Sequence, residues 1–203
     1  MKKLLIIALI AVIFPACSVY QTLTNLSRLQ YRLGTVQNVT LAGVSFSGKK
    51  SVKDFSLLEI TTFTTQLLKG SLPLNLTLNV DALNPNNGTG GYARTDAQLK
   101  SFPFRFLVDG KELVTGNIAN SVNVPGTGEV VQIPIVLNMD VAQLINNGGY
   151  ESAINLVLKI AGVGQGGGSS SVELYARPVV SSVLGDISTP GEIRIIEAQF
   201  SGN

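Results

Sequence analysis

Three segments of the sequence carry residue types whose spacing could do chemistry. Gly43–Lys50 matches a phosphate-binding loop except at its last position, where Lys50 replaces the Ser or Thr that should ligate magnesium. Gly162–Gly168 has glycines spaced as in a dinucleotide-binding turn, but the residues after it alternate like a strand, where that motif needs a helix. Asp81 and Asp96 flank a turn-rich loop and could face each other for acid–base work or calcium binding. We favour plainer interpretations: a strand ending in a solvated turn, a flexible hairpin loop, and solvated charges at strand ends.

The composition of the chain excludes several classes of chemistry. The 203 residues include no His and a single Cys, which rules out Ser–His–Asp and Cys–His sites and Cys- or His-rich zinc sites. Only 14% of the residues are charged, which disfavours a nucleic-acid-binding surface. With 45% hydrophobic residues, the chain is apolar enough to bury the core of one domain. We therefore expect a protein that is not an enzyme, without catalytic residues, cofactor, metal, nucleotide or nucleic-acid partner.

The first residues have the pattern of an export signal. Lys2 and Lys3 precede the unbroken apolar run Leu4–Phe14, which is shorter than the roughly 20 residues that a membrane-spanning helix needs. The only Cys follows a small residue, in Phe14-Pro15-Ala16-Cys17, where cleavage is expected. This arrangement resembles a bacterial lipoprotein signal. The alternative is an ordinary secretory signal peptide with a Cys there by chance.

The resemblance implies that residues 1–16 are removed as a signal peptide and that Cys17 is lipidated. Cys17 would carry a diacylglyceryl thioether and an amine acylated by a fatty acid such as palmitate, and more than one acyl chain gives stable membrane anchoring. Residue 18 is Ser, not the Asp of an inner-membrane retention signal, so the expected location is the cell envelope at the outer membrane. Loss of Lys2 and Lys3 takes the formal net charge from +2 to zero, so the basic precursor is no sign of an anionic partner.

Two helices are predicted in the first third of the mature chain. Residues 18–33 carry an apolar stripe that Gly34 would end, and we expect residues 17–35 to form a lipidated helical tether. Ser51 and Asp54 have the spacing of a capping box, and apolar residues follow at helical spacing, which predicts a helix over 52–68. The threonines at 61, 62, 64 and 65 favour a strand as the alternative.

Residues 36–203 are expected to form one mainly β domain. Asp109-Gly110 predicts a hairpin, Asn84-Pro85 a structural turn, Asp140 the cap of a short helix over 141–145, and Pro134 an edge strand or bulge. The spacing predicts an antiparallel, immunoglobulin- or fibronectin-III-like β-sandwich of about 7–8 strands with one or two helices. The segments predicted as strands are 36–46 with a kink at Ala42-Gly43, 72–81, 93–99, 102–108, 112–118, 130–135, 153–160, 172–180 and 192–200.

Four segments of this region resemble, in order, the LEA14/WHy family of late-embryogenesis-abundant and water-stress domains. They are Leu74–Val80 running into Asn84-Pro85-Asn86, Phe106–Gly116, Val124–Gly128 with Val131–Val136, and Pro190–Ile195. The resemblance covers a little under two-thirds of the chain. It implies a single sandwich with one helix, no catalytic residues and a part in desiccation or stress protection.

Two functions remain open from the sequence. The first is a lipid-anchored envelope module whose Asn-, Thr- and Ser-rich faces contact envelope macromolecules or damaged proteins. The second is a structural accessory subunit of an outer-membrane or surface assembly, which would use the 18–33 helix or an exposed strand edge as its contact. The sequence does not separate them.

Overall fold

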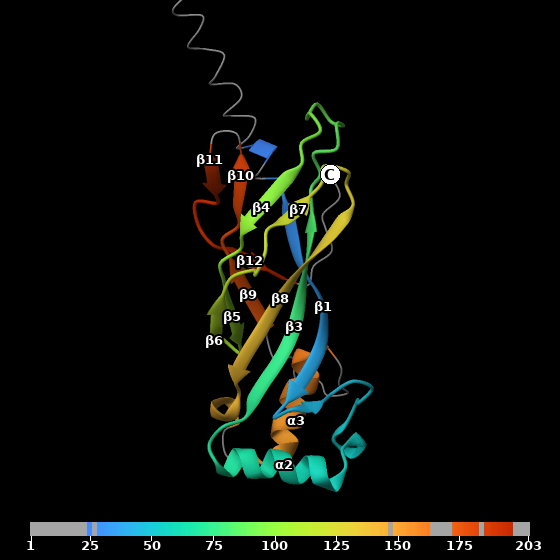
Figure 1. Ribbon diagram of the computed structural model, residues 1–203, viewed down its shortest axis with the longest axis vertical. Helices are drawn as coiled ribbons and strands as arrows, with labels where there is room; N and C mark the ends of the chain where they lie inside the picture. Colours follow the sequence, from blue (N-terminus) through green and yellow to red (C-terminus); the bar gives the residue numbers. More distant parts are fainter. Residues whose placement is uncertain (1–23, 26–27, 146–147, 163–171, 183–184, 197–203) are drawn as a thin grey trace, which may run out of the picture.

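The computed structural model describes residues 24–25, 28–145, 148–162, 172–182 and 185–196. The molecule is elongated, and its strands occupy most of the length (Figure 1). The helices α2 and α3 lie at one end, which we call the helical pole. The loop over 84–96 lies at the opposite end, which we call the loop pole.

One layer of the molecule is a sheet that we call sheet A. It contains β1 (Gln30–Leu41), β2 (Val44–Ser45), β3 (Pro73–Leu83) and β8 (Val130–Asp140), in the antiparallel order β2-β1-β3-β8. Alternation in β3 decides which face is buried, because successive side chains of a strand point to opposite faces. The predicted core residues of β3 are all buried: Leu74, Leu76, Leu78 and Val80. Pro134 lies in β8, which is an edge strand of this sheet, as predicted.

The second layer is built from two short sheets joined end to end. One has the order β11-β10-β4-β7 and the other β12-β9-β5-β6. Pro103 and Pro178, which have no N–H to donate, separate β4 from β5 and β9 from β10. The amide of Arg177 donates to the carbonyl of Pro103 at 2.9 Å, which joins the two sheets across the break. The bounds are β4 (Ala97–Ser101), β5 (Phe104–Val108), β6 (Lys111–Gly116), β7 (Val122–Val124), β9 (Val172–Ala176), β10 (Val179–Ser182), β11 (Gly185–Ser188) and β12 (Ile193–Ile195).

Short helices close the sandwich at the helical pole. They are the 3₁₀ turns Val52–Asp54 and Ala142–Leu144 and the helices α2 (Leu57–Leu68) and α3 (Tyr150–Ile160). Phe63 of α2 packs against Phe55 and Phe46, with ring centroids 5.5 Å and 6.3 Å away. None of the helices within the described residues is long and apolar enough to cross a membrane.

The fold class is confirmed, since the described strands form an antiparallel β-sandwich. The strand predicted over 153–160 is wrong, because these residues form α3. Ile154 and Leu158 fit both periods, but Ala153 and Val157 are also fully buried while Leu156 is not, which is the pattern of a helix face. The short strands β7 and β11 were not predicted.

Two predicted boundaries also need correction. The helix expected over 18–33 does not include Gln30–Leu33, which belong to β1, where Leu33 pairs with Val80 and is buried. The strand therefore begins inside the expected 17–35 tether, of which residues 17–23 and 26–27 lie outside the described residues. The helix expected over 52–68 is interrupted at Phe55-Ser56. The 3₁₀ turn ends before these two residues, and Ser56 is the N-cap of α2.

Candidate functional site

The residues expected to do or bear chemistry fall in separate places. Cys17 lies outside the described residues, as does most of Gly162–Gly168. Asp81 forms an ion pair with Arg32 at 2.9 Å, whereas Asp96 accepts a hydrogen bond from the backbone N–H of Gly126 at 2.8 Å. The two carboxylates thus serve different contacts, and the expected solvated position is wrong for Asp81, which is only 6% exposed because Arg32 pairs with it across the sheet. Within the described ranges, no group of three His, Cys, Asp or Glu residues is arranged to hold a metal ion.

The Asn84-Pro85-Asn86 turn is structural, as predicted. The fully buried Asn84 side chain donates to the carbonyls of Thr95 at 2.8 Å and Val124 at 3.0 Å, and its Oδ1 accepts from the N–H of Asn86 at 3.1 Å. This last bond is the local Asx turn that the sequence indicates. The turn therefore fastens the end of β3 to the strands beside it at the loop pole.

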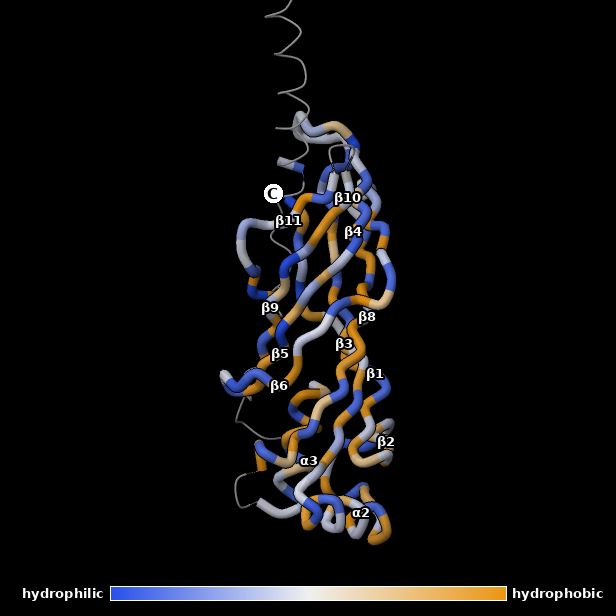
Figure 2. The backbone as a smooth tube through the Cα atoms, turned by 60° about the vertical axis from the view of Figure 1, so that its left-hand side comes forward, coloured by the Kyte–Doolittle hydropathy of each residue, from blue (hydrophilic) through white to orange (hydrophobic). Residues whose placement is uncertain are grey.

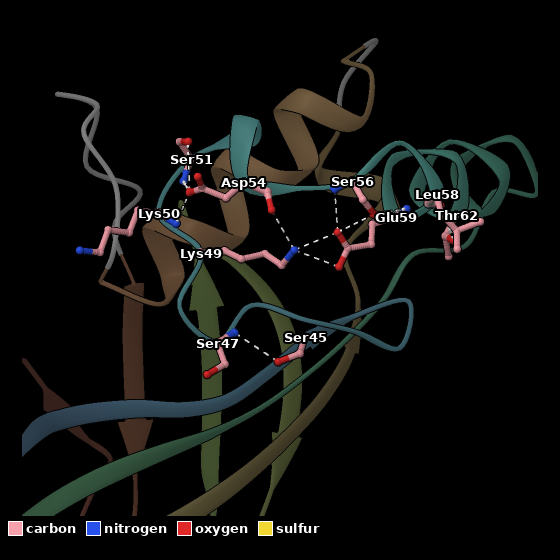
Figure 3. A network of polar contacts seen from close by, with 10 residues as sticks. All are labelled: Ser45, Ser47, Lys49, Lys50, Ser51, Asp54, Ser56, Leu58, Glu59 and Thr62. Atoms are coloured by element: carbon pink, nitrogen blue, oxygen red, sulfur yellow. Dashed lines mark hydrogen bonds and ion pairs between the residues drawn. The ribbon is translucent and has the colours of Figure 1, made fainter.

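Gly43–Lys50 forms β2 and the turn that follows it. Ala42 and Gly43 have φ values of 49° and 81°, so the predicted kink is a full reversal between β1 and β2. Lys49 stands where a phosphate-binding loop has its lysine, and its side chain contacts Asp54 and Glu59. Its Nζ donates to both carboxylate oxygens of Glu59 at 2.9 Å and to the carbonyl of Asp54 at 3.0 Å (Figure 3).

Two consecutive capping boxes lead from this turn into α2. Asp54 accepts from the backbone N–H of Ser51 at 2.8 Å, and Glu59 accepts from that of Ser56 at 2.8 Å (Figure 3). The bonds from Lys49 and Ser56 lower the pKa of Glu59 to about 2. Glu59 is the only charged residue of α2, so the Lys49 contact neutralises that helix while fixing it to the turn.

An open cavity of about 560 Å³ lies beside this network. The edge of β1 forms one wall, the segment Ser45–Lys50 another, and Leu158 and Ala161 at the end of α3 complete it. Asn38 has a φ of 54° at the edge, where β1 carries an extra residue relative to β3. Lys49, which also lines the cavity, is the residue whose amine contacts Glu59.

The outer face of sheet A gathers uncharged polar side chains from strands far apart in the sequence. Its central part, which we call the amide face, is made of two rows in register across the sheet. One row is Gln37, Thr77 and Val136, and the other is Ser45, Thr40, Asn75 and Asn138. Val136 stands among them with 65% of its surface exposed. The sequence indicated the alternation within each strand, but the rows depend on strand pairing.

Comparison with known proteins finds only weak similarity. No protein-family model matches the chain, and no curated protein matches it. Among solved structures it is similar to a protein from Archaeoglobus fulgidus, at 8% identity over 82% of this chain and 90% of that one, with a TM-score of 0.34. It is also similar to a protein from Arabidopsis thaliana, at 14% identity over 85% and 87% of the two chains, with a TM-score of 0.29. Similarity at this level supports no conclusion about function.

Proposed function

We propose that the protein is a non-catalytic binding module of the cell envelope, of the LEA14/WHy stress-protective kind, held at the outer membrane by a lipid on Cys17. The observation that carries the proposal is the amide face. It offers both donors and acceptors, because amide and hydroxyl side chains supply both, and none of its residues is charged. Such a surface suits a partner with neutral hydrogen-bonding groups, such as a polysaccharide or the exposed backbone of a damaged protein.

The segments that resemble the LEA14/WHy family add support, since they lie in both layers of the sandwich. Leu74–Val80 is the middle of β3 and carries part of the amide face on its outer side. Asn84-Pro85-Asn86 holds the end of that strand, and Phe106–Gly116 spans the hairpin of β5 and β6. Pro190–Ile195 includes β12.

A charge placed on the amide face tests the proposal. Val136→Lys and Gln37→Lys alter exposed side chains and should leave folding intact, but they should abolish protection of a reporter enzyme dried with the protein. Asn123→Lys, on the exposed side of β7 in the other layer, is the matched control and should protect like the unaltered protein. Equal protection by all variants would show that the amide face is not the contact.

The alternative function is a structural accessory subunit of an outer-membrane or surface assembly. One observation favours it: β8 is a long edge strand, and edge strands offer unpaired backbone groups to another chain. Affinity capture of the intact lipidated protein from envelope separates the two functions. A single stoichiometric partner favours the subunit, whereas protection without such a partner favours the binding module.

A further inference from the structure

The outward side of α2 carries an uncharged stripe at the helical pole. Leu57 and Leu68 are 81% and 84% exposed, and Leu58 beside them is 78% exposed. Single exposed leucines are ordinary on protein surfaces, but these share one side of one helix. We call the stripe the α2 outward face, and its members are Leu57, Leu58, Thr61, Thr64, Thr65 and Leu68. Their spacing is that of one helical face, and Figure 2 shows apolar segments of α2 at this end of the molecule.

Two of the three threonine hydroxyls in this face, those of Thr61 and Thr64, are already used inside the helix. Thr61 donates to the carbonyl of Leu57 at 2.8 Å, and Thr64 donates to that of Ile60 at 2.9 Å. These two hydroxyls therefore have an acceptor without water, so the two side chains can enter apolar surroundings without losing a hydrogen bond. This arrangement suits contact with a medium that offers no hydrogen-bond partners.

Charges surround the α2 outward face without entering it. Lys53 and Lys69 lie exposed just before and just after α2. The acidic groups nearby are engaged by other groups, since Glu59 is bound by Lys49 and the exposed Asp54 accepts from the backbone N–H of Lys50 and Ser51. An apolar strip with lysines at its ends matches an anionic lipid surface, where leucines enter the interface and long lysine side chains reach the headgroups.

We infer that the α2 outward face seats in the interfacial layer of an anionic lipid bilayer. The size of the face argues against a second copy of this chain as the occupant. A helix of 12 residues is about 18 Å long, and a strip of that length falls well short of the roughly 800 Å² per partner of a stable protein interface. The inference goes beyond the proposed function, since it concerns a different surface from the amide face and from Cys17.

A tryptophan reporter tests this directly, because the chain contains no Trp. Leu58→Trp in the full chain changes an exposed position, and Gln98→Trp, exposed on β4, is the matched control. Vesicles mixing phosphatidylcholine with phosphatidylglycerol should shift the emission of Leu58→Trp to shorter wavelength, and brominated acyl chains should quench it. The Gln98→Trp emission should stay unchanged. Adding Leu68→Ser to the reporter should weaken vesicle binding roughly tenfold, the factor for one buried leucine.

The remaining outcomes each overturn the inference. No shift of Leu58→Trp at low salt would show that the face does not enter lipid. A shift without vesicles that grows with protein concentration would assign the face to a second copy. A shift only with envelope proteins would assign it to a protein partner. Equal shifts of both reporters would mean general adsorption. Because the readout comes from α2 itself, it is independent of insertion through the N-terminal segment and of the amide-face variants.

Discussion

Leu76 lies in the middle of β3, 2% exposed, between the two layers of the sandwich. Leu76→Ala should lower the free energy of unfolding by about 2–5 kcal/mol, because it removes buried methyl groups and leaves a cavity.

Pro85→Ala should cost about 1 kcal/mol or less, since the Asn84 side chain holds the turn from outside the proline ring. Urea unfolding of the two variants measures both values. An unchanged free energy of unfolding for Leu76→Ala would contradict the inward position of Leu76 in β3.

Glu59 makes stability depend on pH in an acidic window. Its pKa of about 2 in the folded protein lies below its ordinary value of 4.5, so the unfolded chain binds the proton first. The contribution is therefore present above about pH 4.5 and is lost as the pH falls toward 2. Glu59→Gln should be less stable than the unaltered protein at pH 7 and should lose less stability across this window.

Urea midpoints measured from pH 7 to pH 2 provide the check. Glu129→Gln, in the exposed turn before β8, is the control for the general effect of removing a carboxylate. Parallel pH profiles for the unaltered protein and Glu59→Gln would contradict the role given to the Lys49–Glu59 contact.

Among the elements, α3 offers the sharpest test of periodicity. As a helix it buries Val157 and exposes Asn155. Val157→Asp should therefore cost about 3–5 kcal/mol, the penalty of an unpaired buried charge, whereas Asn155→Asp should change stability by about 0.5 kcal/mol or less. In the alternating strand both positions would share the outer side, and both changes would be mild. Thermal or urea unfolding of the pair distinguishes the two arrangements.

The elements show what local sequence can and cannot predict. β3 and the Asn84 turn were predictable, because strict alternation and an Asx turn are local properties. In α3 the apolar residues fit both the strand period of two and the helical period of 3.6, and only packing at the helical pole selects the helix. The amide face was hidden, since Gln37, Thr77 and Val136 meet through pairing across the sheet. The α2 outward face was hidden too, because the contact of Phe63 with Phe55 decides which side of that helix is buried.

For the whole molecule, the state of Cys17 is the decisive prediction. Mass spectrometry of the protein from its membrane should find Cys17 as a diacylated and N-acylated N-terminus. Cys17→Ser should keep Met1 and the uncleaved signal, since the lipid-dependent cleavage needs the thiol. An intact Met1 in the unaltered protein, or a soluble form cleaved elsewhere, would contradict lipid anchoring.

The long pairing of β1 with β3, which continues past two register shifts, has a mechanical consequence. β1 runs from the loop pole toward the helical pole, antiparallel to β3, whereas prolines interrupt the strands of the other layer (Figure 1). Tension between the two poles would pull β1 lengthwise past β3, so the hydrogen bonds of this ladder would be loaded in shear and would have to yield together. Sheet A would then carry the tensile load, while the layer broken at Pro103 and Pro178 would bend.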